Sequence, residues 1–95
     1  MIARMGLQEF HPFLESEIAR APEAAGVYVL LQVQIPIHVA GAANLRMRLR
    51  EEKKKFPQAT HFAVEMHASE EQIRARLEQL NKQLGGVRNK GFVGS

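Results

Sequence analysis

The sequence predicts a small α/β domain: a three-stranded sheet, made of an antiparallel hairpin plus a third strand, flanked by helices. Two runs rich in β-branched residues, 27–33 and 35–40, are joined by a link too short for a crossover, which indicates a hairpin. Apolar residues recur at three- and four-residue steps before, between and after the expected strands, as in amphipathic helices. The length of 95 residues and a hydrophobic share of 45% fit one domain with a single core.

The N-terminal part predicts a short helix, or a loop leading into one, over residues 7–20. Its apolar residues recur at helical spacing: Leu7, Phe10, Leu14 and Ile18. Pro12 suits a first turn but not a helix interior, so it limits the helix, and Pro22 ends the segment.

The hairpin and the next helix follow. Pro36 lacks the N–H of a ladder hydrogen bond, so we expect it at a sheet edge or a bulge. The helix is predicted from Gly41 to about Lys55, with Ala42, Leu45 and Leu49 on one face. Pro57 stops it.

Residues 60–66 predict the third strand, because Phe62 and Val64 alternate with their neighbours. Ser69 begins the last helix, and Gln72 three residues later completes a capping-box pattern. The stripe predicted to be buried is Ile73, Leu77, Leu80 and Leu84, with Gly85 and Gly86 as the stop. The glycine-rich residues 87–95 indicate a mobile tail.

The predicted organisation is a lead-in over residues 1–21, one domain over 22–84 and a flexible tail over 85–95. There is no cysteine, which excludes disulfides and thiolate metal sites. No apolar run approaches the roughly 20 residues that a membrane span needs. We therefore expect a cytoplasmic protein without a membrane partner; a homo-oligomer stays open.

Two segments carry a family resemblance. Residues 22–30, PEAAGVYVL, combine a proline turn with a Gly-Val-Tyr strand, and residues 38–48, HVAGAANLRMR, place Asn44-Leu45-x-x-Arg48 directly after the second strand. In this combination the chain resembles the GIY-YIG nuclease superfamily over about residues 20–84. The sequence departs from the family pattern in four places. His38 stands at the second tyrosine, Ala40 at the glycine of the YIG motif, and Glu52 at a usual histidine or tyrosine. The proline–asparagine ending of the family is reduced to GGVRN at residues 85–89.

The resemblance implies a divalent-metal-dependent DNA endonuclease with a degenerate active site. By motif, Tyr28 would help to activate water, Arg48 would steady the phosphate, and Glu78 would hold Mg²⁺ or Mn²⁺, with His38 as a replacement at a functional position. Physically, this is phosphodiester hydrolysis with a Lewis-acid metal and electrostatic stabilisation. It requires the side chains of Arg48 and Glu78 to converge on one groove beside Tyr28 and His38.

Each of these residues also has a structural interpretation. Arg48 could pair with Glu51 or Glu52 on the helix surface, and Glu78 could pair with Lys82 four residues on. Tyr28, the single tyrosine, could bury its ring in the core. His38 is more readily a residue on the face of the sheet than a general base.

The helix over 41–55 carries the clearest local charge. Arg46, Arg50 and Lys53 share one face, and this basic stripe could follow a nucleic-acid backbone or simply be solvated. The formal net charge of +3 permits phosphate-rich partners without demanding them. Three functions therefore compete: an active endonuclease, an inactive nucleic-acid-binding module, and a small protein-interaction or dimerisation domain.

Overall fold

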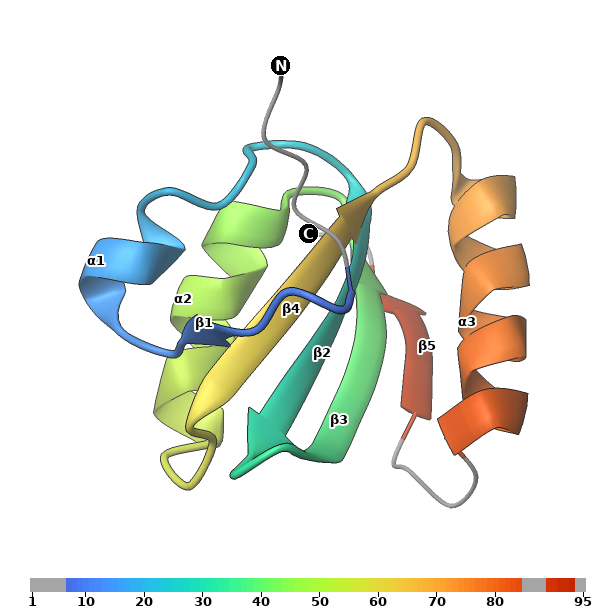
Figure 1. Ribbon diagram of the computed structural model, residues 1–95. Coiled ribbons are helices and arrows are strands. Elements are labelled where there is room, and N and C mark those ends of the chain that lie inside the picture. The colour runs from blue at the N-terminus through green and yellow to red at the C-terminus, as the bar shows by residue number, and fades with distance from the viewer. Residues whose placement is uncertain (1–6, 85–88, 94–95) are drawn as a thin grey trace.

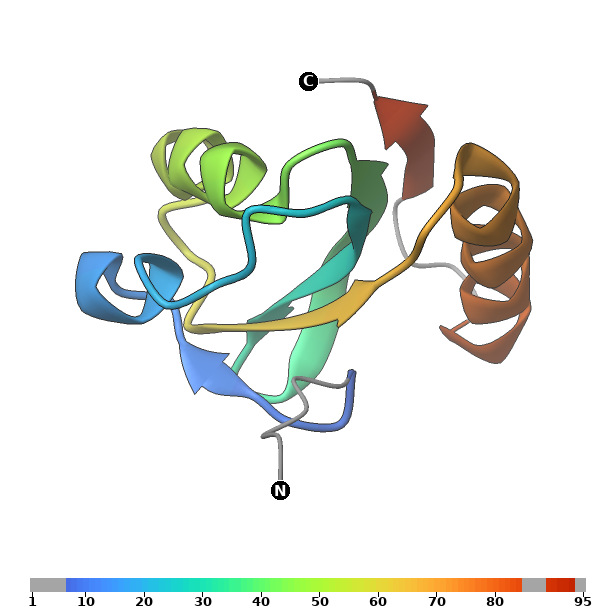
Figure 2. The ribbon, with the colours of Figure 1, turned by 90° about the horizontal axis from the view of Figure 1, so that it is seen from above.

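The computed structural model describes residues 7–84 and 89–93. The elements, in chain order, are β1 (His11–Pro12), α1 (Glu15–Ile18), β2 (Gly26–Gln32), β3 (Ile35–Ala42), α2 (Leu45–Lys55), β4 (His61–Met66), α3 (Glu70–Leu84) and β5 (Asn89–Val93). The strands form one sheet in the order β1-β4-β2-β3-β5. Helices α1 and α2 cover one face of this sheet and α3 covers the other (Figures 1 and 2). The predicted α/β class and the antiparallel hairpin are confirmed.

The hairpin of β2 and β3 forms the centre of the sheet. Val33 and Gln34 form the tip of the hairpin, and both have positive φ, 48° and 69°. Positive φ at both central residues is typical of the tight turn that links hairpin strands through two residues. Leu30 pairs with His38 but Leu31 pairs with Pro36, so Ile37 is the extra residue of a bulge. Pro36 therefore lies next to a bulge, as predicted from its missing N–H.

Helix α2 begins four residues later than predicted. Residues 41 and 42 extend β3, and Asn44 then caps the helix, its side-chain oxygen accepting a hydrogen bond of 3.1 Å from the Met47 N–H. The start of α3 agrees with the capping-box prediction. Ser69 Oγ accepts from the Gln72 N–H at 3.2 Å, and Gln72 Oε1 accepts from the Ala68 N–H at 2.9 Å.

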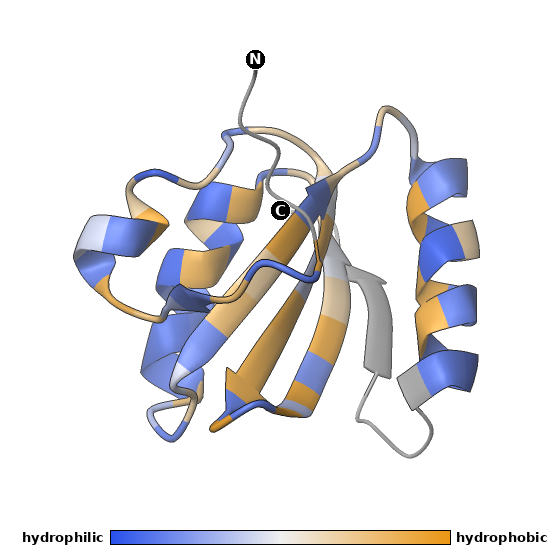
Figure 3. Ribbon diagram, in the orientation of Figure 1, coloured by the Kyte–Doolittle hydropathy of each residue, from blue (hydrophilic) through white to orange (hydrophobic). Residues whose placement is uncertain are grey.

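Two hydrophobic clusters lie on the two faces of the sheet. On the face of α1 and α2, Tyr28 and Leu30 of β2 pack against Leu45 and Leu49 of α2. On the other face, the buried stripe of α3, which is Ile73, Leu77 and Leu80, packs against Val27, Val29, Leu31 and Val39. The apolar colouring of the central strands between the two helical layers shows this arrangement (Figure 3). Alternation along β2 therefore assigns each of its side chains to one helical layer or the other.

Three predicted features need correction. The sheet has five strands and not three, because β1 and β5 add to its two edges. The first helix is short, Glu15–Ile18, since the segment around Pro12 pairs with β4 instead. The predicted mobile tail includes β5, whose backbone pairs in parallel with residues 39–42 of β3.

The rest of that predicted tail, 85–88 and 94–95, lies outside the described residues, as do residues 1–6 of the lead-in. Within the described ranges, none of the helices has the length and apolar character needed to cross a membrane.

Candidate functional site

A buried carboxylate on α2 joins the hairpin to that helix. Glu52 Oε2 accepts a hydrogen bond from the Tyr28 hydroxyl of β2 at 2.7 Å. The same oxygen lies 2.9 Å from Nε2 of His38 on β3. An ionised carboxylate only accepts, so a hydrogen bond between an ionised Glu52 and His38 needs the proton on Nε2. The Tyr28 hydroxyl and His38 Nε2 are themselves 3.5 Å apart. We refer to Tyr28, His38 and Glu52 as the carboxylate cluster.

Strand alternation and helix phase bring these three side chains together. Tyr28 pairs with Ala40 and Leu30 pairs with His38, so Tyr28 and His38 both face α2. On α2, the buried residues Leu45, Leu49 and Glu52 recur at three- and four-residue steps, which points Glu52 at the sheet. Phe56, just after the helix, stacks on the His38 ring with centroids 4.7 Å apart.

The carboxylate cluster is sealed from solvent. Tyr28 and His38 are each 1% exposed and Glu52 is 4% exposed. Burial, followed by the hydrogen bond to Glu52 and the charge of that carboxylate, raises the pKa of Tyr28 far above its ordinary value, and the nearby Arg48 charge only partly offsets this. The Tyr28 hydroxyl is therefore a hydrogen-bond donor to Glu52, and its phenolate is strongly disfavoured.

Arg48 lies one turn before Glu52 on the same helix and is 8% exposed. One terminal nitrogen, Nη1, lies 3.1 Å from Glu51. Its buried Nε has no hydrogen-bond partner among the described residues. The guanidinium thus places a cation with an unused N–H beside the carboxylate cluster, a group suited to an oxyanion.

Glu78 does not reach this cluster. It is exposed on α3, one residue past the buried Leu77 and so turned by about 100° away from it. The buried stripe of α3 packs on the face of the sheet opposite α2. The predicted convergence of Arg48 and Glu78 is therefore wrong, because the sheet separates their helices.

The carboxylate cluster does not fit the divalent metal that the resemblance implies. Within residues 7–84 and 89–93, no three side chains of the types His, Cys, Asp and Glu form a metal-binding group. Glu52 Oε2 already accepts from two donors, and its other oxygen lies 3.9 Å from the Lys55 ammonium. Magnesium prefers freely available oxygen ligands, so this arrangement does not fit it.

The predicted basic stripe is only partly free. Arg46 donates to the Ala21 carbonyl at 2.8 Å and pairs with Glu23 at 3.0 Å. Lys53 donates to the Phe13 carbonyl at 2.9 Å. Arg50 remains exposed. Two of the three cations thus fasten the N-terminal segment to α2, and they are not an open surface for nucleic acid.

Sequence reasoning did not assign Glu52 a role, although it is the residue that organises the site. The signal was present, since Glu52 is one of the departures from the family pattern. A carboxylate four residues after Arg48 on the same helix face was interpreted only as a possible surface partner for that arginine.

Comparison with known proteins identifies the fold of this chain through solved structures and not through its sequence. No family model matches the sequence, and no curated protein matches it. The solved structures that match include two crystal structures of the GIY-YIG N-terminal endonuclease domain of UvrC from Thermotoga maritima. Each has a TM-score of 0.62, with 26% and 25% sequence identity, over 77% of this chain and 93% of the other. Both are described as tyrosine-to-phenylalanine point mutants bound to the catalytic divalent cation. This chain therefore has a GIY-YIG-like fold, that of a nuclease-like domain.

Proposed function

We propose that this chain is a nuclease-like domain that binds DNA without hydrolysing it through the tyrosine centre of its fold. One observation supports this most strongly: the same oxygen of Glu52 accepts a hydrogen bond from the Tyr28 hydroxyl and lies 2.9 Å from Nε2 of His38. These are the two residues at the positions where the family resemblance expects help in activating water.

Hydrolysis of a phosphodiester needs a base near the attacking water and stabilisation of the charge that develops on phosphate. The raised pKa of Tyr28 keeps its hydroxyl protonated. His38 uses its Nε2 proton on Glu52 and is buried. A base must come within hydrogen-bond reach of the water it deprotonates, and a sealed cluster does not meet that condition.

Cations on the outer surface of α2 support binding to DNA. Arg50, Lys54 and Lys55 are exposed, and the chain as a whole carries a formal net charge of +3. Lysine and arginine contacts to phosphates supply most of the sequence-independent affinity for DNA. Arg48 lies on the same helix, but it is only 8% exposed and its Nε is buried, so the exposed cations would make the phosphate contacts.

The structural neighbours carry a catalytic divalent cation, and by analogy Mg²⁺ or Mn²⁺ would be the candidate here. Glu78, the residue expected to hold it, lies on the other face of the sheet, and Glu52 is engaged. We therefore expect DNA binding by this chain to be independent of Mg²⁺ and Mn²⁺. We place this binding in the cytoplasm, as the cysteine-free sequence suggests.

A metal-dependent endonuclease is the second candidate. The observation that favours it is the retained Arg48, nearly buried and with an Nε that no described residue satisfies. A buried polar group without a partner is unfavourable for stability, and an anionic ligand would complete its contacts.

One experiment separates the two candidates. Labelled duplex, branched and single-stranded DNA is incubated with the full chain, with and without Mg²⁺ or Mn²⁺, and both binding and cleavage are scored. We expect salt-sensitive binding to intact DNA in all conditions. Replacing Arg50 and Lys54 together by alanine should weaken binding and reduce the salt slope by about 2, because each of the two cations neutralises one phosphate.

Arg74→Ala is the matched control, because Arg74 is an exposed arginine on α3 and lies outside the proposed surface. Metal-dependent cleavage that disappears in Arg48→Ala would replace our proposal with the endonuclease. Neither binding nor cleavage, together with a dimer in solution, would favour the protein-interaction domain instead.

A further inference from the structure

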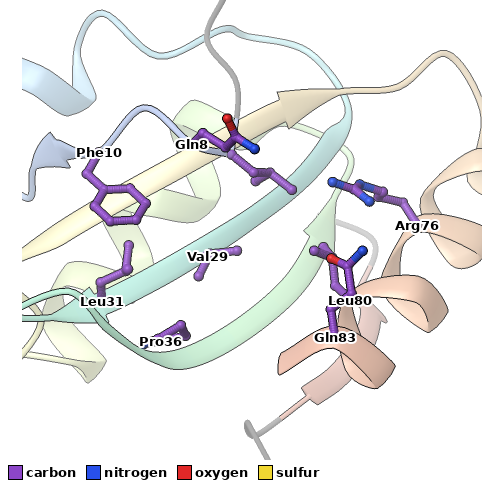
Figure 4. A pocket seen from close by; sticks show the side chains of 9 residues that line it. Gln8, Phe10, Val29, Leu31, Pro36, Arg76, Leu80 and Gln83 are labelled. Atoms are coloured by element: carbon purple, nitrogen blue, oxygen red, sulfur yellow. The ribbon is translucent and has the colours of Figure 1, made fainter. Parts of the chain in front are cut away.

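A pocket of about 180 Å³ opens on the face of the sheet that carries α3, away from the carboxylate cluster (Figure 4). Its walls are mostly apolar: Phe10, Val29, Leu31, Pro36 and Leu80 line it. They come from the segment before β1, from the central hairpin and from α3, so three parts of the fold contribute. Val29, Leu31 and Leu80 are also members of the core cluster on this face, which makes the base of the pocket a rigid surface.

Three polar side chains stand at the rim of this apolar surface: Arg76, Gln8 and Gln83. In Figure 4 the Arg76 side chain extends from α3 toward β2. No hydrogen bond ties the side-chain amide of Gln8 or Gln83 to any other described residue. The rim thus offers hydrogen-bonding groups that the described part of the chain leaves unused.

The Arg76 guanidinium is held in a fixed orientation. Its Nε donates to Glu65 Oε1 at 2.8 Å, and its Nη1 donates to Gln79 Oε1 at 3.2 Å. Glu65 is itself held by His67 Nε2, 2.7 Å from the same oxygen. The remaining terminal nitrogen of Arg76, Nη2, makes no hydrogen bond within residues 7–84. A pre-oriented guanidinium with a free edge is well suited to a carboxylate.

We propose that this pocket binds a small amphipathic carboxylate, with one aromatic ring or a short aliphatic chain as its apolar part. Apolar cavities of roughly 150 Å³ accept a benzene ring, so a volume of about 180 Å³ fits a body of this size. The apolar part would cover Val29, Leu31 and Leu80, and the carboxylate would accept from Arg76 Nη2 and from a glutamine amide at the rim. An apolar pocket with a few convergent polar groups is the usual form of a small-molecule site.

The charge of Arg76 favours a carboxylate over a neutral or a positively charged ligand of the same shape. An ammonium of the same shape would face the Arg76 cation, and a neutral alcohol would gain only an ordinary hydrogen bond there. Hydrogen bonds between charged groups are stronger than neutral ones by an amount that corresponds to about tenfold in affinity. We therefore expect binding in the order carboxylate, alcohol, amine.

The test is a titration of the full chain, labelled with ¹⁵N, with benzoate and with hexanoate, followed by amide chemical shifts. Saturable shifts are expected at Val29, Leu31 and Leu80, with smaller changes around Glu52. Benzyl alcohol and benzylamine serve as matched probes, and each should bind about tenfold more weakly or less. Absence of saturable shifts, shifts centred on another surface, or equal binding of acid and alcohol would overturn the proposal.

Two variants assign the contact to Arg76. Arg76→Gln should lose about tenfold in affinity for benzoate and keep its affinity for benzyl alcohol, whereas the exposed Arg74→Gln should change neither. Because Arg76→Gln also breaks the pair with Glu65, Arg76→Lys is tested beside it and should bind benzoate with intermediate affinity. Unchanged benzoate binding in folded Arg76→Gln would refute the assignment. DNA binding, measured in the same variants, is expected to be unaltered, so this test stands apart from the proposed function.

Discussion

At the scale of single residues, Glu52 determines what this site can do. An ionised carboxylate in a buried position is unfavourable unless hydrogen bonds and charge compensate it. Here the Tyr28 hydroxyl, the His38 ring and, further off, the Lys55 ammonium provide that compensation. The same contacts that make Glu52 tolerable in the core also occupy Tyr28 and His38. Under the proposed function, the glutamate at position 52 thus links the packing of the core to the loss of the hydrolytic role of Tyr28 and His38.

Substitutions at Tyr28 and at His38 in the carboxylate cluster should lower the free energy of unfolding by different amounts. Tyr28→Phe deletes one hydrogen bond to a charged group and should lower the free energy of unfolding by about 2 kcal/mol. His38→Ala leaves Glu52 buried with less compensation and opens a cavity beside Phe56, so a loss of about 4 kcal/mol is expected. Urea unfolding measures both values.

The exposed Glu71→Ala is the reference for these two variants, and it should change the free energy of unfolding by less than about 0.5 kcal/mol. Equal, small effects of Tyr28→Phe and His38→Ala would mean that the hydrogen bonds of the cluster are not formed in solution.

Residue-level prediction from the sequence succeeded in part. The family motif placed Tyr28, His38 and Arg48 in one region, and the structure does bring them together around α2. It failed for Glu78, because the choice of sheet face on which a helix packs depends on the connections of the whole chain. The role of Glu52 also needed the fold, since the partner atoms come from two strands and are 24 and 14 residues away in sequence.

At the scale of elements, the tip of the hairpin carries backbone strain. Val33 has φ of 48° and is 70% exposed, so its side chain contributes little burial in return. A β-branched residue is poorly suited to the left-handed region, where each non-glycine residue costs roughly 1–2 kcal/mol. The two runs rich in β-branched residues predicted the hairpin. The turn itself lacks the Asn-Gly pair that is typical of such links, so its geometry is evident only from the backbone of the structure.

Replacing the tip with the residues that this turn prefers should stabilise the protein. Val33→Asn combined with Gln34→Gly is expected to raise the free energy of unfolding by about 1 kcal/mol. Thermal unfolding followed by circular dichroism gives the comparison. Val33→Ala, which keeps the unfavourable φ, should show no such gain, and a gain of equal size there would attribute the effect to the side chain instead of the backbone.

At Gly26, in contrast to the hairpin tip, a substitution should destabilise the protein. It starts β2, and a Cβ at this position would collide with the carbonyl oxygen of Glu65 on β4. Gly26→Ala should therefore push β4 away from β2 and destabilise the protein by about 2 kcal/mol, within the range of overpacked core positions. Ala25→Gly, one residue earlier, is the control in the same unfolding assay. A Gly26→Ala variant as stable as the parent would show that β4 can shift freely at this point.

At the scale of the whole molecule, the sheet separates the two proposed sites. The carboxylate cluster and the exposed cations of α2 lie on one side, and the pocket beside α3 lies on the other. Hydrophobic periodicity in the sequence predicted α2 and α3, and two runs rich in β-branched residues with a very short link predicted the central hairpin. It could not show β1 or β5, because a two-residue strand and a glycine-containing strand have no periodic pattern of their own and form only against an existing edge.

Removing strand β5 tests whether its pairing with β3 stabilises the protein. A chain that ends at Leu84 would lose the parallel pairing with β3 and leave the backbone groups of residues 39–42 without those partners. We expect a loss of about 2 kcal/mol in the free energy of unfolding, at about 1 kcal/mol for each ladder hydrogen bond. A chain that lacks only residues 94–95 should match the parent. If both truncated chains were as stable as the parent, the tail predicted from the sequence would be the better description.

The central claim is that Tyr28 is not available as a base. Because the chain has a single tyrosine, the ionisation of Tyr28 can be measured directly by near-ultraviolet absorbance. The folded pKa is raised, so the stability that the Tyr28 proton contributes is complete below the ordinary pKa of about 10 and is lost as pH rises above it. We predict that phenolate appears only as the far-ultraviolet circular dichroism shows unfolding. In Glu52→Gln, ionisation should move to lower pH, because the carboxylate charge is gone. A phenolate that forms near pH 10 in the folded parent protein would contradict the account.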